Sequence, residues 1–392
     1  MHRFWQILLV ATALLFTPTV KIEASNHQPP TEQAAPDYTS QAQNLLERMT
    51  PTERVGQLFL VTFEGIDTSQ NSDIYDLVAN YHIGGVALDA QNNNITGNTI
   101  DVNSVPQQLA RLNNHLQEIA LFGGLSQPPE TDELDGNNSL PTAEPTIQPD
   151  PSRASIPLFI AITQGGDNVN SIQGGLTEIP SEMAIGATWQ PSQAQAVGQI
   201  LGRELEAIGI NLLLGPSLNV LNQPQQTLPD QGLGTHVFGG NAYWVSQMGT
   251  AYITGLKVGS GSRLAVIPTH FPGIGSSDRI GSDEIATIRR SYPDLLANEL
   301  IPFETAATGG GNTADGFLTA HIRYQGLQGN ILPSTAPLSF DPQAIETLFQ
   351  VESLNQWRTN GGILVSDALG IEAIERFYDN TGQEFPHRQV AK

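Results

Sequence analysis

Short runs of apolar residues alternate along the chain with longer stretches in which apolar residues recur every three or four positions. The short runs are typical of buried strands and lie at Leu58–Phe63, Gly85–Leu88, Leu158–Ile162, Leu212–Leu214, Leu264–Ile267, Gly316–Thr319 and Gly362–Val365. The longer stretches predict helices at Val105–Leu121, Pro191–Ile208, Ala242–Leu256, Pro293–Ala307 and Asp341–Leu354. Such a βα repeat predicts an α/β fold with a parallel sheet covered by helices. The number of units favours a (β/α)8 barrel of the TIM type, and an open doubly wound sheet is the alternative.

The start of the folded region is indicated by a helix-capping pattern. Thr50 can cap a helix, Pro51 suits its first position, and Glu53 completes a capping box three residues after Thr50. A barrel domain is therefore expected over residues 45–392, ending with a helix at Ile371–Tyr378.

The N-terminus has the order of a secretory signal. Arg3 precedes an apolar stretch at Phe4–Phe16, and small residues follow at Ala24 and Ser25. Residues 1–24 are predicted to be a signal peptide, with an uncleaved anchor as the alternative, and residues 25–44 a flexible lead. The protein is expected to be exported to an extracellular, periplasmic or cell-surface location.

A second polar segment interrupts the βα rhythm at residues 123–155, which are rich in Pro, Gly, Asn and acidic residues. It is interpreted as a disordered insertion between a helix and a strand, on the barrel face away from the strand ends that carry the site. A partner-binding segment is the alternative.

Composition narrows the function. The chain has 392 residues, 39 Asp and Glu against 17 Lys and Arg, a formal charge of −22 and no Cys. A nucleic acid or an anionic membrane needs a basic footprint, so neither is an expected partner. Without thiols, chemistry must use His, Asp, Glu, Ser or Tyr. Neutral polar ligands remain, and the sequence does not indicate an oligomeric state.

Candidate site residues follow the predicted strands, because reactive groups of parallel barrels lie at the carboxyl ends of strands. The residues at these ends are Thr163, Asn219, Thr269, His270, His321 and Asp367. Amides, hydroxyls, two histidines and one carboxylate suit a polyhydroxylated ligand.

Each of these residues also has a structural interpretation. Asp367 can cap a helix beginning near Ala368, and His270 or His321 can be a buried histidine without a catalytic role. A metal site made of the two histidines and Asp367 is disfavoured, because their sequence spacing is not that of metal ligands. No metal and no cofactor is expected.

Seven ordered motifs make the chain resemble glycoside hydrolase family 3, and within it the β-N-acetylhexosaminidase branch, over about residues 45 to 390. The motifs are Met49–Phe63, Ile83–Val86, Ile156–Ile162, Pro180–Ala187, Glu204–Asn211, His270–Gly273 and Val365–Leu369. The resemblance implies a carbohydrate substrate and a retaining mechanism in which Asp367 is the nucleophile. It also implies a ligand-positioning role for His270.

Several positions depart from the family's pattern. Thr163 and Asn219 stand where the family usually has Asp, His236 where it has Arg, and Thr269 where it has Lys. The loop that carries the branch's Asp-Ser-His acid–base triplet has no His here, and its candidate acids are Asp278, Asp283 and Glu284.

The family's barrels continue beyond the Ser-Asp-Ala-Leu motif with a further strand, whereas this chain ends at Lys392. The barrel is therefore expected to be unclosed, and the chain to be part of a longer product. An active retaining glycosidase and a catalytically silent carbohydrate-binding or interaction protein both fit the altered site. A metal-dependent hydrolase on an unrelated barrel is the third reading.

Overall fold

The computed structural model describes residues 38–96, 104–123, 155–167, 170–222, 233–277 and 284–380. The predicted signal peptide and nearly all of the predicted insertion at 123–155 lie outside these ranges. The chain divides into two compact units, residues 1–47 and 48–392. Nearly all of helix α1 (Tyr38–Arg48) belongs to the first unit and overlaps the stretch expected to be a flexible lead.

The second unit contains a seven-stranded sheet in the order β1-β2-β3-β4-β5-β7-β9, and every pair of neighbours is parallel. Its strands are β1 (Leu60–Val61), β2 (Gly85–Ala87), β3 (Phe159–Ile162), β4 (Leu212–Ser217), β5 (Ala265–Phe271), β7 (Gly316–Thr319) and β9 (Ile363–Ser366). All seven predicted strands are confirmed. Within the described ranges β1 and β9 are the edges and do not pair with each other, so the curled sheet is a TIM-type barrel that is incomplete.

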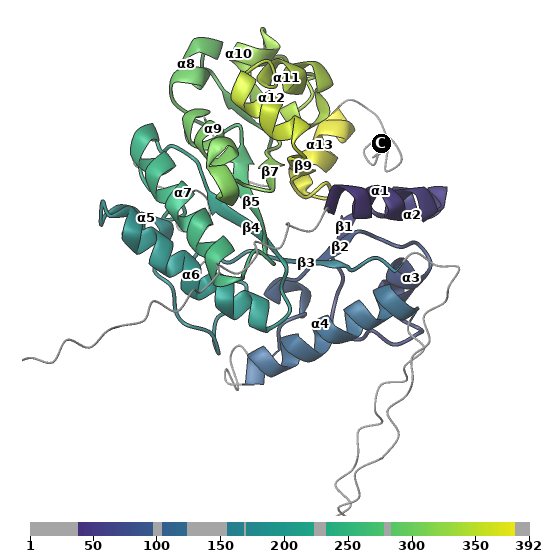
Figure 1. Ribbon diagram of the computed structural model, residues 1–392. Coiled ribbons are helices and arrows are strands. Elements are labelled where there is room, and N and C mark those ends of the chain that lie inside the picture. Colours follow the sequence, from purple (N-terminus) through teal and green to yellow (C-terminus); the bar gives the residue numbers. More distant parts are fainter. Residues whose placement is uncertain are drawn as a thin grey trace, which may run out of the picture. The chain divides into compact units, whose positions relative to one another are not determined.

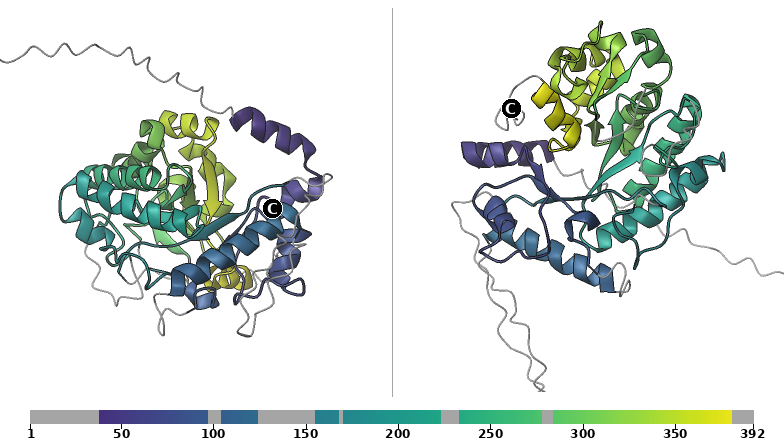
Figure 2. Two further views of the ribbon diagram at one scale, coloured as in Figure 1. Left: turned by 60° about the horizontal axis from the view of Figure 1, so that its bottom comes forward. Right: turned by 180° about the vertical axis from the view of Figure 1, so that it is seen from behind.

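Helices cover the outside of this sheet (Figures 1 and 2). They are α2 (Pro51–Gly56), α3 (Asp73–Ala79), α4 (Val105–Phe122), α5 (Glu182–Gly186), α6 (Pro191–Ala207), α7 (Ala242–Gly259), α8 (Tyr292–Ala297), α9 (Ile301–Thr308), α10 (Gln325–Gln328), α11 (Pro342–Leu348), α12 (Glu352–Thr359) and α13 (Glu372–Asn380). The predicted capping box is confirmed at α2, where Glu53 N donates to Thr50 Oγ1 and Thr50 N donates to Glu53 Oε2. Among the described helices, none combines the length and apolar character needed to cross a membrane.

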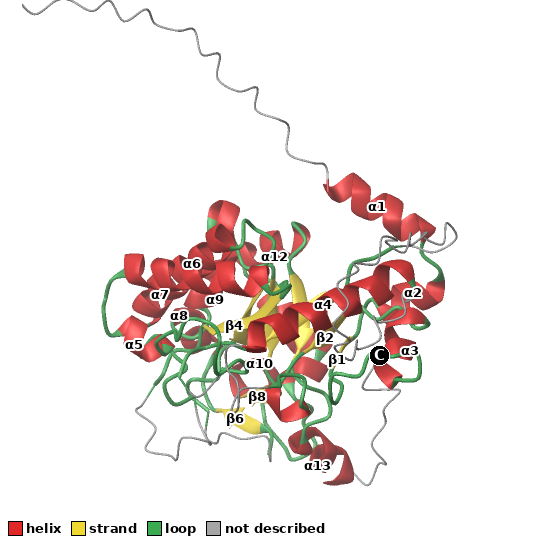
Figure 3. Cartoon of the chain, turned by 90° about the horizontal axis from the view of Figure 1, so that it is seen from below, coloured by secondary structure: helices red, strands yellow, loops and turns green. Residues whose placement is uncertain are grey.

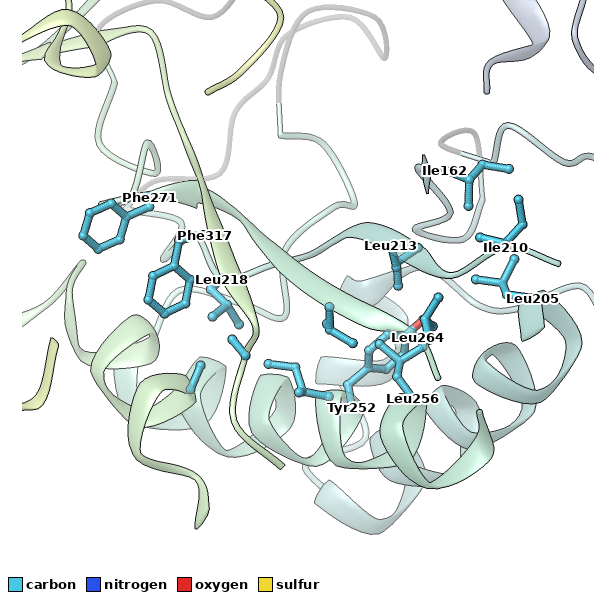
Figure 4. Packing of buried hydrophobic residues seen from close by; sticks show 14 of the residues in the cluster. Ile162, Leu205, Ile210, Leu213, Leu218, Tyr252, Leu256, Leu264, Phe271 and Phe317 are labelled. Carbon is cyan, nitrogen blue, oxygen red and sulfur yellow. The ribbon is translucent and has the colours of Figure 1, made fainter. Parts of the chain in front are cut away.

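Each central strand buries both of its faces. Ile160, Leu213, Val266 and Phe317 belong to the large core between the strands and the helices. The residues that alternate with them form a second cluster on the other face, made of Ala161, Leu212, Ile267 and Leu318. Figure 4 shows the first layer, in which Tyr252 and Leu256 of α7 lie beside Leu264 and Leu213. The strands therefore lie between the helical layer and a small apolar interior. Figure 3 shows the strands with helices packed around them.

Helices α6 and α7 touch through their backbones. A Cβ on Gly198 would lie 2.3 Å from the carbonyl oxygen of Tyr252, and one on Gly255 would lie 2.1 Å from that of Gln195. Gly202 and Gly259 repeat the arrangement one turn further along each helix. Two pairs of glycines spaced four residues apart thus let the two helices approach as closely as their main chains allow.

Two stretches predicted as continuous helices are each divided into two helices, so this part of the prediction was wrong. Pro293–Ala307 is split into α8 and α9, because Pro302 cannot continue the helix through Asn298 and instead takes a first-turn position of α9. Asp341–Leu354 is split into α11 and α12, where Val351 is extended and the buried Phe349 and Leu354 lie on either side of the break. The short parallel pair β6 (Ala286–Ile288) and β8 (Ile322–Tyr324) was not predicted.

The close approach of α6 and α7 predicts that Gly198→Ala and Gly255→Ala each lower the free energy of unfolding by about 1–3 kcal/mol through overpacking. The sign of this change distinguishes close backbone contact from an ordinary helix, in which Gly→Ala raises the free energy of unfolding by about 1 kcal/mol. Urea unfolding followed by circular dichroism measures the difference.

Ala196→Ser is the matched control, since Ala196 lies on the exposed side of α6. It should change stability by about 0.5 kcal/mol or less. Unchanged or greater stability in the glycine variants would show that the helices can separate at no cost.

Candidate active site

The carboxyl ends of four strands bring the predicted site residues to one end of the sheet. Ser217 is in register with Thr269, Thr269 with Leu318, and Thr319 with Ser366. Strands β4 and β5 extend beyond their predicted ends, so Thr269 and His270 lie within β5. Asn219, His270, His321 and Asp367 therefore belong to the same rim.

His270 is held by Asn219, which is fully buried. The Asn219 Oδ1 atom accepts from Ile274 N at 2.9 Å, which identifies the other end of this amide as the donor. Its Nδ2 lies 2.8 Å from Ser217 Oγ and 3.2 Å from His270 Nδ1. Because Nδ1 must accept this bond, a neutral His270 carries its proton on Nε2.

Burial lowers the pKa of His270, and the nearby charge of Asp367 offsets this only in part. The ring is therefore neutral near pH 7. Its Nε2–H is a neutral donor suited to a hydroxyl or a carbonyl oxygen rather than a charged group that pairs with anions.

His321 is also neutral, since burial lowers its pKa more than Asp367 raises it. Its Nε2 lies 3.1 Å from the Ala368 carbonyl oxygen and its Nδ1 lies 2.6 Å from Ser339 Oγ. Both ring nitrogens are thus engaged by the protein, and the ring fixes the backbone directly after Asp367. Substrate binding by His321 stays a prediction. The contacts of its ring give it a role in positioning the Asp367 backbone.

Asp367 is half-buried at the end of β9. Its backbone N–H donates to the Thr319 carbonyl at 3.0 Å, and Oδ1 accepts from Ala368 N at 2.8 Å. Among the described residues Oδ2 has no such partner. The alternative that Asp367 caps a helix beginning near Ala368 is wrong, because the next helix, α13, starts at Glu372.

A third histidine lies beside a carboxylate that the sequence did not single out. Thr235 Oγ1 donates to Asp167 Oδ2 at 3.2 Å. Burial lowers the pKa of His236, and the charge of Asp167 offsets this only in part. His236 Nδ1 is buried and has no hydrogen-bond partner in the described ranges. Asp167 follows Gly165 and Gly166 and has a φ of 54°, so a strand followed by Gly-Gly-Asp was the signal that could have pointed to it.

The remaining predicted residues are less constrained. Thr163 is half-buried and Thr269 is buried. Glu284 is exposed two residues before β6, whereas Asp278 and Asp283 lie outside the described residues. Across the described part of the chain, no three His, Asp or Glu side chains gather as a metal ion requires.

Glu182 is a buried carboxyl group that sequence reasoning missed. Its Oε1 accepts from Ser217 N at 2.8 Å, and its Oε2 is buried with no partner in the described ranges. Burial raises the pKa of Glu182 to about 8. The group is therefore largely protonated at neutral pH and lies directly behind the end of β4.

A parallel barrel with a carboxylate and neutral histidines at its strand ends is the class of protein that this fold and site define. Residues 112–384, more than half of the chain, match the family model described as "Glycosyl hydrolase family 3 N terminal domain". The chain belongs to glycosyl hydrolase family 3.

Named relatives agree with this assignment. Beta-hexosaminidase A of Pseudoalteromonas piscicida is 24% identical over 318 residues, which are 80% of this chain and 45% of that protein. Beta-hexosaminidase LpqI of Mycobacterium tuberculosis is 24% identical over 378 residues, 94% of this chain and 79% of that protein.

A solved family 3 β-N-acetylglucosaminidase from Paenibacillus sp. str. FPU-7 has a TM-score of 0.64 and 26% identity, over 84% of this chain and 51% of that chain. The chain thus spans about half the length of this structure and of the Pseudoalteromonas relative.

The protonated Glu182 predicts a dependence of stability on pH. In the unfolded chain its pKa is 4.5 and in the folded protein about 8, so the folded state binds more protons between these values. Stability should therefore fall as pH rises from 4.5 to 8, by up to about 1.4 kcal/mol per pH unit. Glu182→Gln should remove this fall, as measured by urea unfolding at pH 5, 6, 7 and 8.

Glu178→Gln, at an exposed position on the same segment, should leave the fall in place. If the two variants have the same pH profile, Glu182 is not the titrating group.

Proposed function

We propose that the chain is the barrel of a retaining glycosidase of β-N-acetylhexosaminidase type that acts on neutral β-linked sugars. The observation that carries this proposal is Asp367, a half-buried carboxylate at the end of β9 whose Oδ2 has no hydrogen-bond partner among the described residues. Its charge acts on both His270 and His321. Family membership and the names of the relatives support the choice of substrate class.

The proposed first step is attack of Asp367 Oδ2 on the anomeric carbon. The bond to the leaving oxygen breaks, and that oxygen takes a proton from a general acid. Asp367 is then bonded to the sugar as an ester. In the second step water attacks the same carbon, gives its proton to the same group acting as a base, and releases Asp367.

The neutral residues of the rim have a consistent role in this scheme. His270 Nε2–H can donate to a sugar hydroxyl, and Asn219 fixes the ring that carries it. Hydrogen bonds of His321 and Ala368 N hold the Asp367 loop in place. Asp167 and His236 supply a second polar pair where the family usually has an Arg. We propose that this pair binds sugar hydroxyls in place of that Arg.

A second candidate is favoured by one observation. Thr163, Thr269 and His236 are uncharged or neutral where the family usually has Asp, Lys and Arg, so charge-assisted bonds to the sugar are fewer. On this reading the protein binds a glycan without cleaving it, and a sugar should raise its melting temperature in the absence of turnover.

Asp367→Asn should lower the turnover of an aryl β-N-acetylglucosaminide by about a thousandfold or more, because the amide cannot act as the nucleophile. A 2-deoxy-2-fluoro glycoside should label the wild type covalently, and peptide mass spectrometry should locate the label on Asp367. The assays use the longest available form of the protein, with an aryl β-glucoside in parallel.

The exposed Asp73 offers a control, Asp73→Asn, which should keep full turnover. A folded wild type that neither turns over nor becomes labelled would reject hydrolysis and favour the silent glycan binder.

The general acid is sought among Asp278, Asp283 and Glu284, each replaced by its amide. Loss of the acid should slow a substrate with a poor leaving group by about a hundredfold or more, while a dinitrophenyl substrate, whose leaving group needs no proton, is slowed far less. Kinetics with the two substrates separate this pattern from a general loss of activity. Equal loss on both substrates, or none in any variant, would reject these three candidates.

A further inference from the structure

Three aromatic side chains form a cluster on the outside of the barrel, here called the aromatic platform: Trp189, Tyr243 and Trp244. The rings of Trp189 and Trp244 meet edge to face, with centroids 5.0 Å apart, and those of Tyr243 and Trp244 do the same at 5.4 Å. Trp189 is 57% exposed and Tyr243 is 61% exposed. Two large rings are thus presented to solvent and held in fixed orientations by the third.

The platform lies on the same side of the barrel as the candidate active site. Trp189 lies two residues before Pro191, the first residue of α6, and Tyr243 is the second residue of α7. In a parallel βα fold these helix starts follow the carboxyl ends of the preceding strands, here β3 and β4. A long ligand bound at the rim therefore approaches the barrel from the side on which the platform lies.

The backbone holds Trp189 in an unusual position. Its φ of 54° places a bulky residue in the left-handed region, which L-amino acids other than Gly, Asn and Asp rarely adopt. Its N–H donates to the Gly186 carbonyl at 3.1 Å, which fixes the turn between α5 and α6. The surrounding structure therefore holds the exposed ring in place. Backbone strain that is held in this way is often found at binding sites.

The platform lies in an uncharged part of the chain. Residues 183–202 and 231–256 contain no Asp, Glu, Lys or Arg, although the chain has 39 acidic and 17 basic residues. The exposed neighbours of the rings along the chain are amides and hydroxyls, at Thr188, Gln190 and Asn241. These two segments favour a neutral ligand, because they offer an anion or a cation no partner of opposite charge.

We propose that the aromatic platform is an accessory binding site for a neutral β-linked polysaccharide, separate from the residues around Asp367. This inference rests on the proposed function for the chemical class of the ligand. The C–H faces of pyranose rings stack on exposed aromatic rings, while sugar hydroxyls bond to surrounding amides. The platform would keep the polymer at the barrel while the rim acts on one sugar at a time.

Two other occupants fit less well. An anionic membrane surface needs basic side chains, which both segments lack. A second copy of the chain needs about 800 Å² of buried surface on each partner, several times what two half-exposed rings supply at 150–250 Å² for a fully buried ring.

The test measures retention of the full chain on chitin, together with titration of a soluble N-acetylglucosamine hexamer followed by Trp fluorescence. Tyr243→Ala should weaken binding about tenfold, and Trp189→Ala at least as much. Tyr81→Ala is the matched control, because Tyr81 is 55% exposed and lies outside the platform. It should bind as the wild type does, and equal melting temperatures should show that each variant is folded.

The outcomes separate this inference from the proposed function. Tyr243-dependent retention without turnover of the aryl substrate supports the platform and rejects hydrolysis. Turnover abolished by Asp367→Asn, with retention equal in Tyr243→Ala and Tyr81→Ala, supports hydrolysis and overturns the platform. A wild type not retained on chitin also overturns it, as would Tyr243-dependent dimers in light scattering or binding to anionic phosphatidylserine vesicles in place of glycan.

Discussion

The structure depends on one constraint, the burial of a parallel sheet on both faces. Alternate residues of each strand must be apolar toward the helices and apolar toward the interior, as Ile160 and Ala161 are on β3. This requirement leaves polar chemistry only at the strand ends, where the side chains leave both layers. The position of Asn219, His270, His321 and Asp367 is thus a consequence of how the core is built.

The same constraint explains how much of the fold could be predicted. The central strands are buried on both faces and the edge strands β1 and β9 are more exposed, yet all seven are apolar runs in the sequence. All seven were therefore found, some with ends a few residues short. Periodicity carries no information on where a helix is interrupted, and the breaks just before Pro302 and at Val351 were missed. The pair β6 and β8 is too short for a pattern to form and depends on contacts between distant segments.

The residues of the candidate site also fall into two groups, those that a local sequence pattern indicates and those that depend on distant partners. Asp367 and His270 could be identified because they follow apolar runs and match a family motif. Glu182 and Ser339 could not, because their importance comes from partners far away in sequence, Ser217 and His321. Asp167 has a local signal, the Gly-Gly-Asp after β3, but its partner Thr235 is far away in sequence. The neutral state of the histidines is likewise a property of burial, which no local pattern shows.

The charge-free segments around Trp189 and Tyr243 have an electrostatic consequence. The chain carries a formal charge of −22, and none of the acidic residues responsible lies within residues 183–202 or 231–256. These two segments therefore add no formal charge to the electrostatic field of the protein. Debye screening alters encounters with the acidic remainder of the surface. Contacts that the side chains of these two segments make depend instead on shape and on the release of water, and change little with ionic strength.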